Sequence, residues 1–299
     1  MRGRQTNQDQ REKLLLAGRI AKEARDRGIM LSEPGVRVLD VVDQVEELIR
    51  KMGGQPAFPV NIGIDAVAAH YTPATGDSQR FPPRGILKFD VGVHVDGYIA
   101  DTAASKDLGG SNNLLVSCSQ SALEQAIETV KAGISLRYLG GVIERTIQSS
   151  GYRPVTNLMG HSIERYNLHA GFSVPNVSDI SDGTVPDDIV IAIEPFATSG
   201  KGFVVSGRIG NIFSLVRRKK LDDASLNQFQ EVIDERYSTL PFAERWLGEF
   251  GNRTHLLRKL LRLGILHGYQ TLIEASGAPV SQWEHTLIVS REGVVATSK

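Results

Sequence analysis

The first half of the chain repeats apolar residues at helical spacing, which predicts several amphipathic helices. The first covers residues 8–28, where Gly28 is expected to end it, and the second runs from about Val38 to Met52. The same spacing returns over residues 119–135 and 140–152. We therefore expect four helices in this half of the chain.

Other segments of the chain have the alternating pattern of β-strands. Residues 88–105, "KFDVGVHVDGYIADTAAS", predict two short strands around an Asp-Gly turn, and residues 187–198 and 282–290 predict further strands. From about residue 211 to 267 the chain is charged and helical in pattern, without a strand signal. A helical block between strand-rich segments indicates an insertion in a larger α+β domain.

The residues around the Asp-Gly turn fix the register of a hairpin. Asp96 and Gly97 are favoured central residues of a type I′ turn, so that Gly92 faces Asp101. Side chains alternate between the two faces of a strand, which puts Asp90 and Asp101 on one face as diagonal neighbours, roughly 7–8 Å apart at the backbone. The apolar residues of the first strand line the other face, which should be core: Leu87, Phe89, Val91, Val93 and Val95.

Two carboxylates placed so close together need compensation if they are buried. In a low-dielectric site their repulsion amounts to several kcal/mol, and a divalent cation or a shared proton would relieve it. The alternative is that one or both side chains face water at the sheet edge, which is common in antiparallel sheets. From the hairpin alone, this solvent-exposed arrangement is the favoured interpretation.

Three more polar residues, each next to apolar sequence, favour the alternative in which a divalent cation is bound. His161 follows Gly160 in an irregular stretch, Glu194 closes a strand and Glu284 opens another. A set of carboxylates with one imidazole suits hard or borderline divalent ions, and enough carboxylates can bridge two of them. The spacing along the chain does not establish that these five residues meet.

The composition describes an ordinary globular protein. Of 299 residues, 41% are hydrophobic and 23% charged, and the formal net charge is zero, so no global basic field favours nucleic acid. The polar N-terminus lacks the apolar core of a signal peptide, and no run of about 18 apolar residues predicts a membrane span. Cys118 is the only cysteine, which excludes an internal disulfide. We expect a cytoplasmic enzyme or binding protein.

Five segments resemble type 2 methionine aminopeptidases, in the order expected for that family. They are "AFPVNIGIDAVAAHYTP", "KFDVGVHVDGYIADTA", "NLMGHSIERYNLHAG", "IAIEPFATSGKG" and "SQWEHTLIV". The resemblance covers essentially the whole chain, and the short N-terminus is similar to that of archaeal members. It implies a pita-bread fold, in which a pseudo-twofold, mostly antiparallel curved sheet is covered by helices. Residues 1–210 and 268–299 would form this catalytic domain, and 211–267 the helical insertion of type 2.

The resemblance also implies a dinuclear metal site. The family's metal ligands fall on Asp90, Asp101, His161, Glu194 and Glu284. Two divalent ions, which could be Co²⁺, Mn²⁺, Fe²⁺ or Zn²⁺, would activate a water that attacks the first peptide bond, and Glu194 would also transfer protons. "NIGID" departs from the family pattern, so that Gly63 and Asp65 are unusual there.

Substrate residues follow from the same resemblance. His70 and His169 fall on two histidines that contact the substrate, and both are expected to be catalytic. Four apolar or aromatic positions match the pocket for the methionine side chain: Phe58, Leu168, Tyr269 and, less closely, Ile212. The implied substrates are nascent chains and peptides that begin with methionine and have a small second residue.

Two other classes of protein remain as alternatives. A prolidase or aminopeptidase P shares the ligands and the fold but normally carries an added N-terminal domain. A pseudo-aminopeptidase that binds protein or nucleic acid would lose ligands, and none is missing here. We expect a monomer without stable nucleic-acid or membrane binding. The cluster "RRKK" (217–220) could support transient association with ribosomes, although such clusters are usually solvated.

Overall fold

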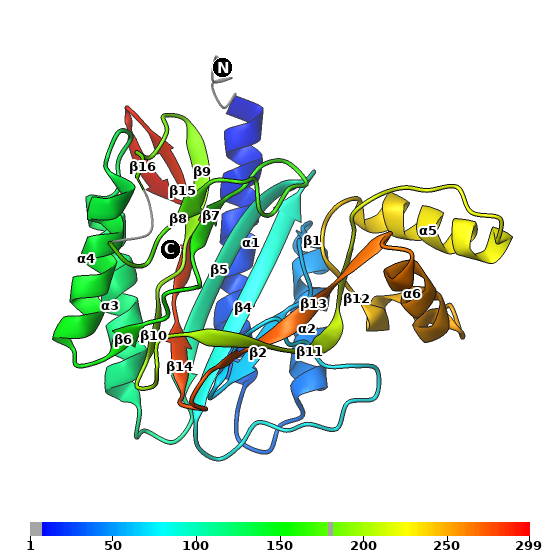
Figure 1. Cartoon of the computed structure of the whole chain (residues 1–299), viewed down its shortest axis with the longest axis horizontal. Coiled ribbons are helices and arrows are strands. Elements are labelled where there is room, and N and C mark those ends of the chain that lie inside the picture. The colour runs from blue at the N-terminus through cyan, green and yellow to red at the C-terminus, as the bar shows by residue number, and fades with distance from the viewer. Residues whose placement is uncertain (1–7, 179–181) are drawn as a thin grey trace.

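A wide antiparallel sheet lies at the centre of the molecule (Figure 1). The computed structural model describes residues 8–178 and 182–299 of the chain. The sheet has nine strands, and its main path is β1 (Gln55–Pro56), β4 (Ile86–Val95), β5 (Tyr98–Asp107), β15 (Glu284–Ser290), β9 (Ile189–Ile193), β7 (Gly160–Ser162) and β8 (Ser173–Val174). Off this path, β2 (Asn61–Ile64) pairs with β4 and β16 (Gly293–Ala296) pairs with β15.

Two smaller antiparallel sheets continue from this one. The three-stranded sheet has the order β14 (Val280–Gln282), β10 (Phe196–Thr198) and β6 (Arg153–Pro154). The four-stranded sheet has the order β12 (Phe242–Ala243), β11 (Val204–Leu215), β13 (Leu266–Glu274) and β3 (Val67–Ala69). In Figure 1, β11 and β13 cross in front of the central sheet, on the side away from α1.

Two pairs of helices cover the strands. α1 (Gln8–Leu31) and α2 (Val38–Lys51) bury their apolar faces against β2 and β4, in one continuous core cluster. α3 (Asn113–Thr129) and α4 (Leu136–Ser149) bury theirs against β9 and β15, in a second cluster. Each half of the sheet thus has its own helix pair, and the predicted α+β sheet covered by helices is confirmed.

Several predicted helix boundaries are wrong. α1 continues past Gly28, which packs so closely on Phe89 that a β-carbon there would lie 2.2 Å from the ring. This glycine therefore permits helix-to-sheet contact rather than ending the helix. α3 begins and ends about six residues before the predicted 119–135, and Ser135 instead caps α4, where its hydroxyl accepts from the backbone N–H of Tyr138.

The two predicted strands 187–198 and 282–290 are each broken near a glutamate. β9 ends at Ile193 and β10 starts at Phe196, and these two strands belong to different sheets. In the same way, Trp283 separates β14 from β15. The two breaks lie side by side, because Ile193 pairs with His285 and Phe196 pairs with Gln282. The chain therefore passes from one sheet to another at both glutamates.

The segment from 211 to 267 contains helices with their own core. α5 (Ala224–Tyr237), the 3₁₀ helix η1 (Glu244–Leu247) and α6 (Arg253–Arg262) surround a cluster that includes Phe229 and Leu260. The prediction of a block without strands is wrong, because β11, β12 and β13 all enter it. Its role as a separate insertion subdomain stays a prediction. Among the described residues, none of the helices has the length and apolarity that a bilayer crossing requires.

Candidate metal centre and substrate cavity

The hairpin of β4 and β5 has the predicted register. Val95 pairs with Tyr98 and Gly92 with Asp101, and the turn residues Asp96 and Gly97 have the positive φ angles of a type I′ turn, 52° and 82°. The apolar face of β4 is buried against α1 and α2, as expected. Asp90 and Asp101 consequently share the opposite face, which is directed away from the helices.

The other predicted ligands come from neighbouring strands of the same sheet. His161 lies on β7, Glu194 directly follows β9, and Glu284 is the first residue of β15. Side chains hold these strands in position. The hydroxyl of Thr102 donates to the carbonyl of Glu284 at 2.8 Å, and the N–H of Asp101 donates to the hydroxyl of Thr286 at 2.7 Å. The sheet thus fixes the backbone under both carboxylates.

The five predicted ligands line one cavity of about 520 Å³. Ligand atoms of Asp101, His161 and Glu284 all lie within 4.8 Å of one another, and Nε2 of His161 is 3.6 Å from Oδ2 of Asp101. Asp101, His161 and Glu284 are buried. The interpretation that Asp90 and Asp101 face water at an exposed edge is therefore wrong.

Burial gives these acids unusual electrostatics. It raises the pKa of Asp101 to about 7 and raises the pKa values of Asp90, Glu194 and Glu284, to which the neighbouring carboxylates add. Among the described residues, Oδ1 of Asp90, Oδ1 of Asp101, Oε1 of Glu284 and Nδ1 of His161 are buried without a hydrogen-bond partner. Buried lone pairs of this kind are costly unless something binds them. The residues present therefore fit a site for divalent cations.

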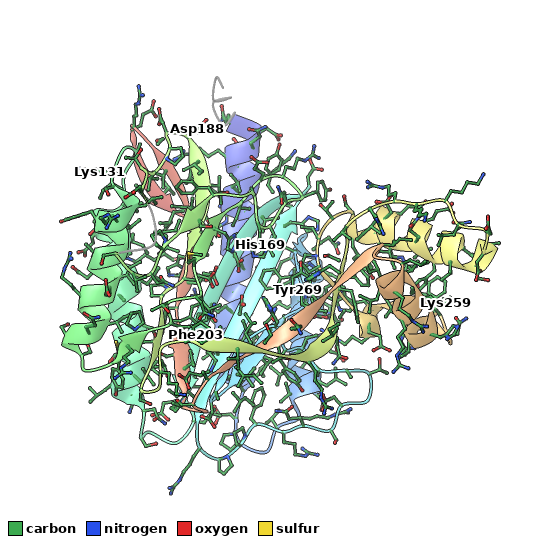
Figure 2. The ribbon with its side chains drawn as sticks, in the orientation of Figure 1. Lys131, His169, Asp188, Phe203, Lys259 and Tyr269 are labelled. Carbon is green, nitrogen blue, oxygen red and sulfur yellow. The ribbon has the colours of Figure 1, made fainter. Side chains whose placement is uncertain are left out.

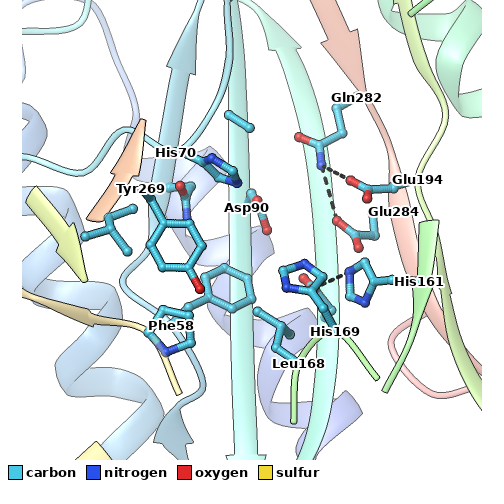
Figure 3. A pocket seen from close by; sticks show the side chains of 15 residues that line it. Phe58, His70, Asp90, His161, Leu168, His169, Glu194, Tyr269, Gln282 and Glu284 are labelled. Carbon is cyan, nitrogen blue, oxygen red and sulfur yellow. Dashed lines mark hydrogen bonds and ion pairs between the residues drawn. The ribbon is translucent and has the colours of Figure 1, made fainter. Parts of the chain in front are cut away.

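Four lining residues were missed from the sequence: Asn61, Ala69, Pro241 and Gln282. Gln282 is the most informative, because its Nε2 lies 3.3 Å from Oε2 of Glu194 and 3.2 Å from Oε2 of Glu284 (Figure 3). It lies two residues before Glu284, a spacing that would put both side chains on one face of a continuous strand. That spacing was the available signal, but an amide near a strand end has many other uses.

His70 and His169 lie over the acidic cluster. The ring of His169 is 4.3 Å from that of His161, and both histidines line the cavity. His70 has a left-handed backbone, with φ of 64°, and its Nδ1 is 3.1 Å from the carbonyl oxygen of Gln270. A carbonyl only accepts, so Nδ1 carries the proton and the neutral ring keeps Nε2 as an acceptor. Burial lowers the pKa of His70 to about 4.

The residues predicted to hold the methionine side chain also line this cavity. Phe58, Leu168 and Ile212 are buried, and Tyr269 stands edge-on to His70 with ring centroids 5.4 Å apart. Figure 3 shows Phe58 and Tyr269 on one side of Asp90, and Glu194 and Glu284 on the other. In Figure 2, His169 and Tyr269 lie in front of the central sheet, whereas Lys259 lies on the distant helix α6. The cavity therefore has an acidic side and an apolar side.

The unusual residues Gly63 and Asp65 are explained by buried Lys88. A β-carbon at Gly63 would lie 2.5 Å from the Lys88 side chain, which passes beneath it. The Lys88 ammonium donates to the carbonyls of Asp65 and Val280 at 2.9 and 2.8 Å. Asp65, with φ of 49°, accepts from the N–H of Ile86. The departure from the family pattern thus fits a well-bonded loop and disturbs no cavity residue.

A helix-backed antiparallel sheet with a buried, carboxylate-rich cavity fits a metal-dependent hydrolase. Residues 12–217 match the model of metallopeptidase family M24. The curated relatives called "Methionine aminopeptidase" include one from Methanocaldococcus jannaschii, 40% identical over 96% of this chain and 98% of its own length. Another, from Saccharolobus solfataricus, is 42% identical over 98% of this chain and 99% of its own length. The chain belongs to metallopeptidase family M24 and, within it, to the methionine aminopeptidases.

Solved structures share the fold at lower identity. A thermophilic Arx1 superposes with a TM-score of 0.83 at 15% identity, covering 97% of this chain and 91% of that one. The methionine aminopeptidase of Thermotoga maritima gives 0.74 at 20% identity over 99% of both chains. The Pyrococcus furiosus prolidase gives 0.64 at 16% identity, and this chain covers 65% of it. The predicted pita-bread fold is confirmed.

Proposed function

We propose that this protein removes the N-terminal methionine from nascent proteins and peptides by metal-dependent hydrolysis of the first peptide bond. The observation that carries the proposal is one cavity that joins buried acids, two histidines and an apolar pocket. The names of its relatives support the same activity. A small second residue is expected, as the resemblance to type 2 methionine aminopeptidases implies.

The residues that would hold the metals are Asp90, Asp101, His161, Glu194 and Glu284. We propose two ions, because the carboxylates outnumber what one ion requires, and Co²⁺, Mn²⁺, Fe²⁺ and Zn²⁺ all suit this donor set. Such ions, when bound, lower the pKa of a water and polarise the scissile carbonyl. Gln282 orients two of the carboxylates toward the site by donating to both.

The remaining steps belong to side chains of the chain itself. Glu194 accepts the proton of the attacking water and returns it to the leaving amine. His70 receives a hydrogen bond from a substrate N–H, because its Nδ1 is already engaged with Gln270. His169 hydrogen-bonds the carbonyl as charge develops on its oxygen. Phe58, Leu168, Ile212 and Tyr269 bind the methionine side chain in the apolar part of the cavity.

Two peptides separate this proposal from its alternatives. The protein is incubated with Co²⁺ or Mn²⁺ and either Met-Ala-Ser or Ala-Pro-Ala, and free amino acids are measured. We expect methionine release from the first peptide only. Cleavage of only the second would indicate a proline-directed enzyme, and no cleavage with no bound metal by elemental analysis would indicate a binding protein.

We propose a cytoplasmic monomer that acts on chains as they leave the ribosome. In the basic cluster 217–220, the guanidinium of Arg218 pairs with Asp234 at 2.5 Å and that of Arg217 donates to the carbonyl of Leu263. These contacts favour a structural use of both arginines. Equal ribosome association after neutralisation of all four residues would exclude a role for the cluster.

A further inference from the structure

A second cavity, of about 860 Å³, adjoins the metal-site cavity. The two share five lining residues, Ala69, His70, His161, His169 and Glu194. The residues of the methionine pocket line only the first cavity, whereas Leu158, Met159, Phe172 and Leu272 line only the second of these two. The reacting bond, held beside the histidines, would therefore have the methionine on one side and the second cavity on the other.

The walls that belong to the second cavity alone carry no charge. They consist of Asn157, Leu158, Met159, Gly160, Gly171, Phe172, Ser173, Phe196 and Leu272. Leu158, Met159, Phe172 and Leu272 are half-buried, so their apolar surfaces face the cavity in part. Two other surface cavities differ, since one includes Arg50, Glu235 and Arg236 and the other includes Glu164 and Arg165.

Hydrogen bonds hold this wall in place relative to the metal site. The buried side chain of Asn176 donates to the carbonyls of Leu158 and Glu194, at 2.9 and 3.0 Å. The Asn157 amide exchanges two hydrogen bonds of 2.9 Å with the backbone of Val204. The wall is therefore preformed, and little of its freedom would be lost on binding a peptide.

We propose that the second cavity binds the side chain of the third residue of the substrate and selects apolar residues there. This proposal rests on the proposed function, because it takes the position of the cleaved bond from it. The peptide runs from the methionine pocket, past His70 and His169 with its small second residue, into the uncharged cavity. The occupant is thus the downstream part of the same substrate chain.

The selectivity follows from the chemistry of the wall. A leucine side chain at the third position gains apolar burial against Met159 and Phe172. An aspartate or lysine there loses hydration, and the walls that belong to the second cavity alone offer it no opposite charge. Because the cavity is open to water on one side, we expect partial burial and a preference of about five- to tenfold in kcat/KM for leucine over aspartate.

The test uses three peptides that differ only at the third residue: Met-Ala-Leu-Ser, Met-Ala-Asp-Ser and Met-Ala-Lys-Ser. Methionine release is measured for the wild type, for Met159→Lys and for the control Met30→Lys, which changes an exposed methionine near the end of α1. The wild type and the control should prefer leucine. Met159→Lys should shift the preference toward aspartate and further away from lysine, which a general loss of packing would not do.

Two results would overturn the proposal. One is equal kcat/KM for the three peptides in the wild type. The other is an unchanged order of preference in Met159→Lys. The fraction folded is compared by circular dichroism, and each variant is judged by the ratio between peptides, which is independent of the active fraction. Absence of methionine release from Met-Ala-Ser in the wild type would instead overturn the proposed function, and this proposal with it.

Discussion

At the scale of single residues, the site groups acidic side chains in a buried place, although such grouping opposes folding. Asp90, Asp101, Glu194 and Glu284 lie together in one cavity, and burial raises the pKa of each. Without a cation, their mutual repulsion opposes folding. The four acids therefore cost stability in the metal-free protein and become useful only when positive charge is bound.

A pH series on the metal-free protein tests this cost at Asp101. The folded-state pKa of Asp101 is about 7, above the usual 3.8. As pH rises from about 4 to 7, the unfolded chain loses this proton while the folded chain retains it, so the wild type loses stability. Asp101→Asn lacks this group. We expect the free energy of unfolding in urea, wild type minus variant, to fall over that range, whereas a constant difference would contradict the account.

Substitution of His70 tests a role in the reaction apart from metal binding. His70→Ala removes the Nε2 acceptor of an imidazole ring whose tautomer is fixed by the carbonyl of Gln270. We expect kcat/KM for Met-Ala-Ser to fall about a hundredfold. Bound metal, measured by elemental analysis, should be unchanged. Loss of metal together with activity would assign His70 to the metal site instead.

The sequence predicted the two aspartates better than the rest of the cavity. Asp96-Gly97 fixed the hairpin register, and alternation along β4 and β5 then placed both carboxylates on one face. The distant partners could be joined to them only through the family resemblance. Gln282 and Asn61 were missed, because amides at strand ends carry no distinctive pattern and their use depends on which strands become neighbours.

At the scale of elements, a buried ion pair docks the 3₁₀ helix η1 onto α2. The guanidinium of Arg245 pairs with Glu46 of α2, and Nε1 of Trp246 donates to the same carboxylate at 2.6 Å. Glu46 also accepts from the N–H of Val60, and Arg245 donates to the hydroxyl of Thr72 at 2.8 Å. Val60 and Thr72 are close in sequence to the cavity residues Phe58, Asn61 and His70, so this contact braces the substrate site.

Removal of Glu46 should therefore be costly. Glu46→Ala leaves Arg245 buried without its main partner, and we expect a loss of about 3–5 kcal/mol in the free energy of unfolding. The control is Asp43→Ala, which removes the exposed second partner of Arg245 at 3.5 Å and should cost less than about 1 kcal/mol. Equal urea midpoints for the two variants would show that the buried pair does not hold η1.

Element boundaries were predicted least well, for reasons that lie in tertiary contacts. Gly28 resembles a helix stop, yet it serves the close approach of α1 to Phe89. Residues 187–198 and 282–290 each match a single strand pattern, yet the chain passes between sheets within both segments, at Glu194, which was expected to close a strand, and at Glu284, which was expected to open one. Local sequence predicts neither which residue packs against a glycine nor which strands pair in a sheet.

At the scale of the whole molecule, two helix-backed halves meet at the proposed metal site. Asp90 and Asp101 lie on β4 and β5, in the half of the sheet that α1 and α2 cover. Glu194 and Glu284 lie at the ends of β9 and β15, in the half that α3 and α4 cover, and His161 lies on β7, which pairs with β9. The site exists only when both halves are folded. Sequence periodicity predicted strands and helices, and the resemblance implied a curved sheet covered by helices, but neither predicted the strand order that unites the halves.

The most direct test of the account is methionine release from Met-Ala-Ser by metal-stripped protein while Mn²⁺ is titrated back. We predict no release from the stripped protein, recovery on addition of Mn²⁺, and recovery reduced roughly a thousandfold in Asp101→Asn. Full release by protein shown to be metal-free by elemental analysis would contradict the account.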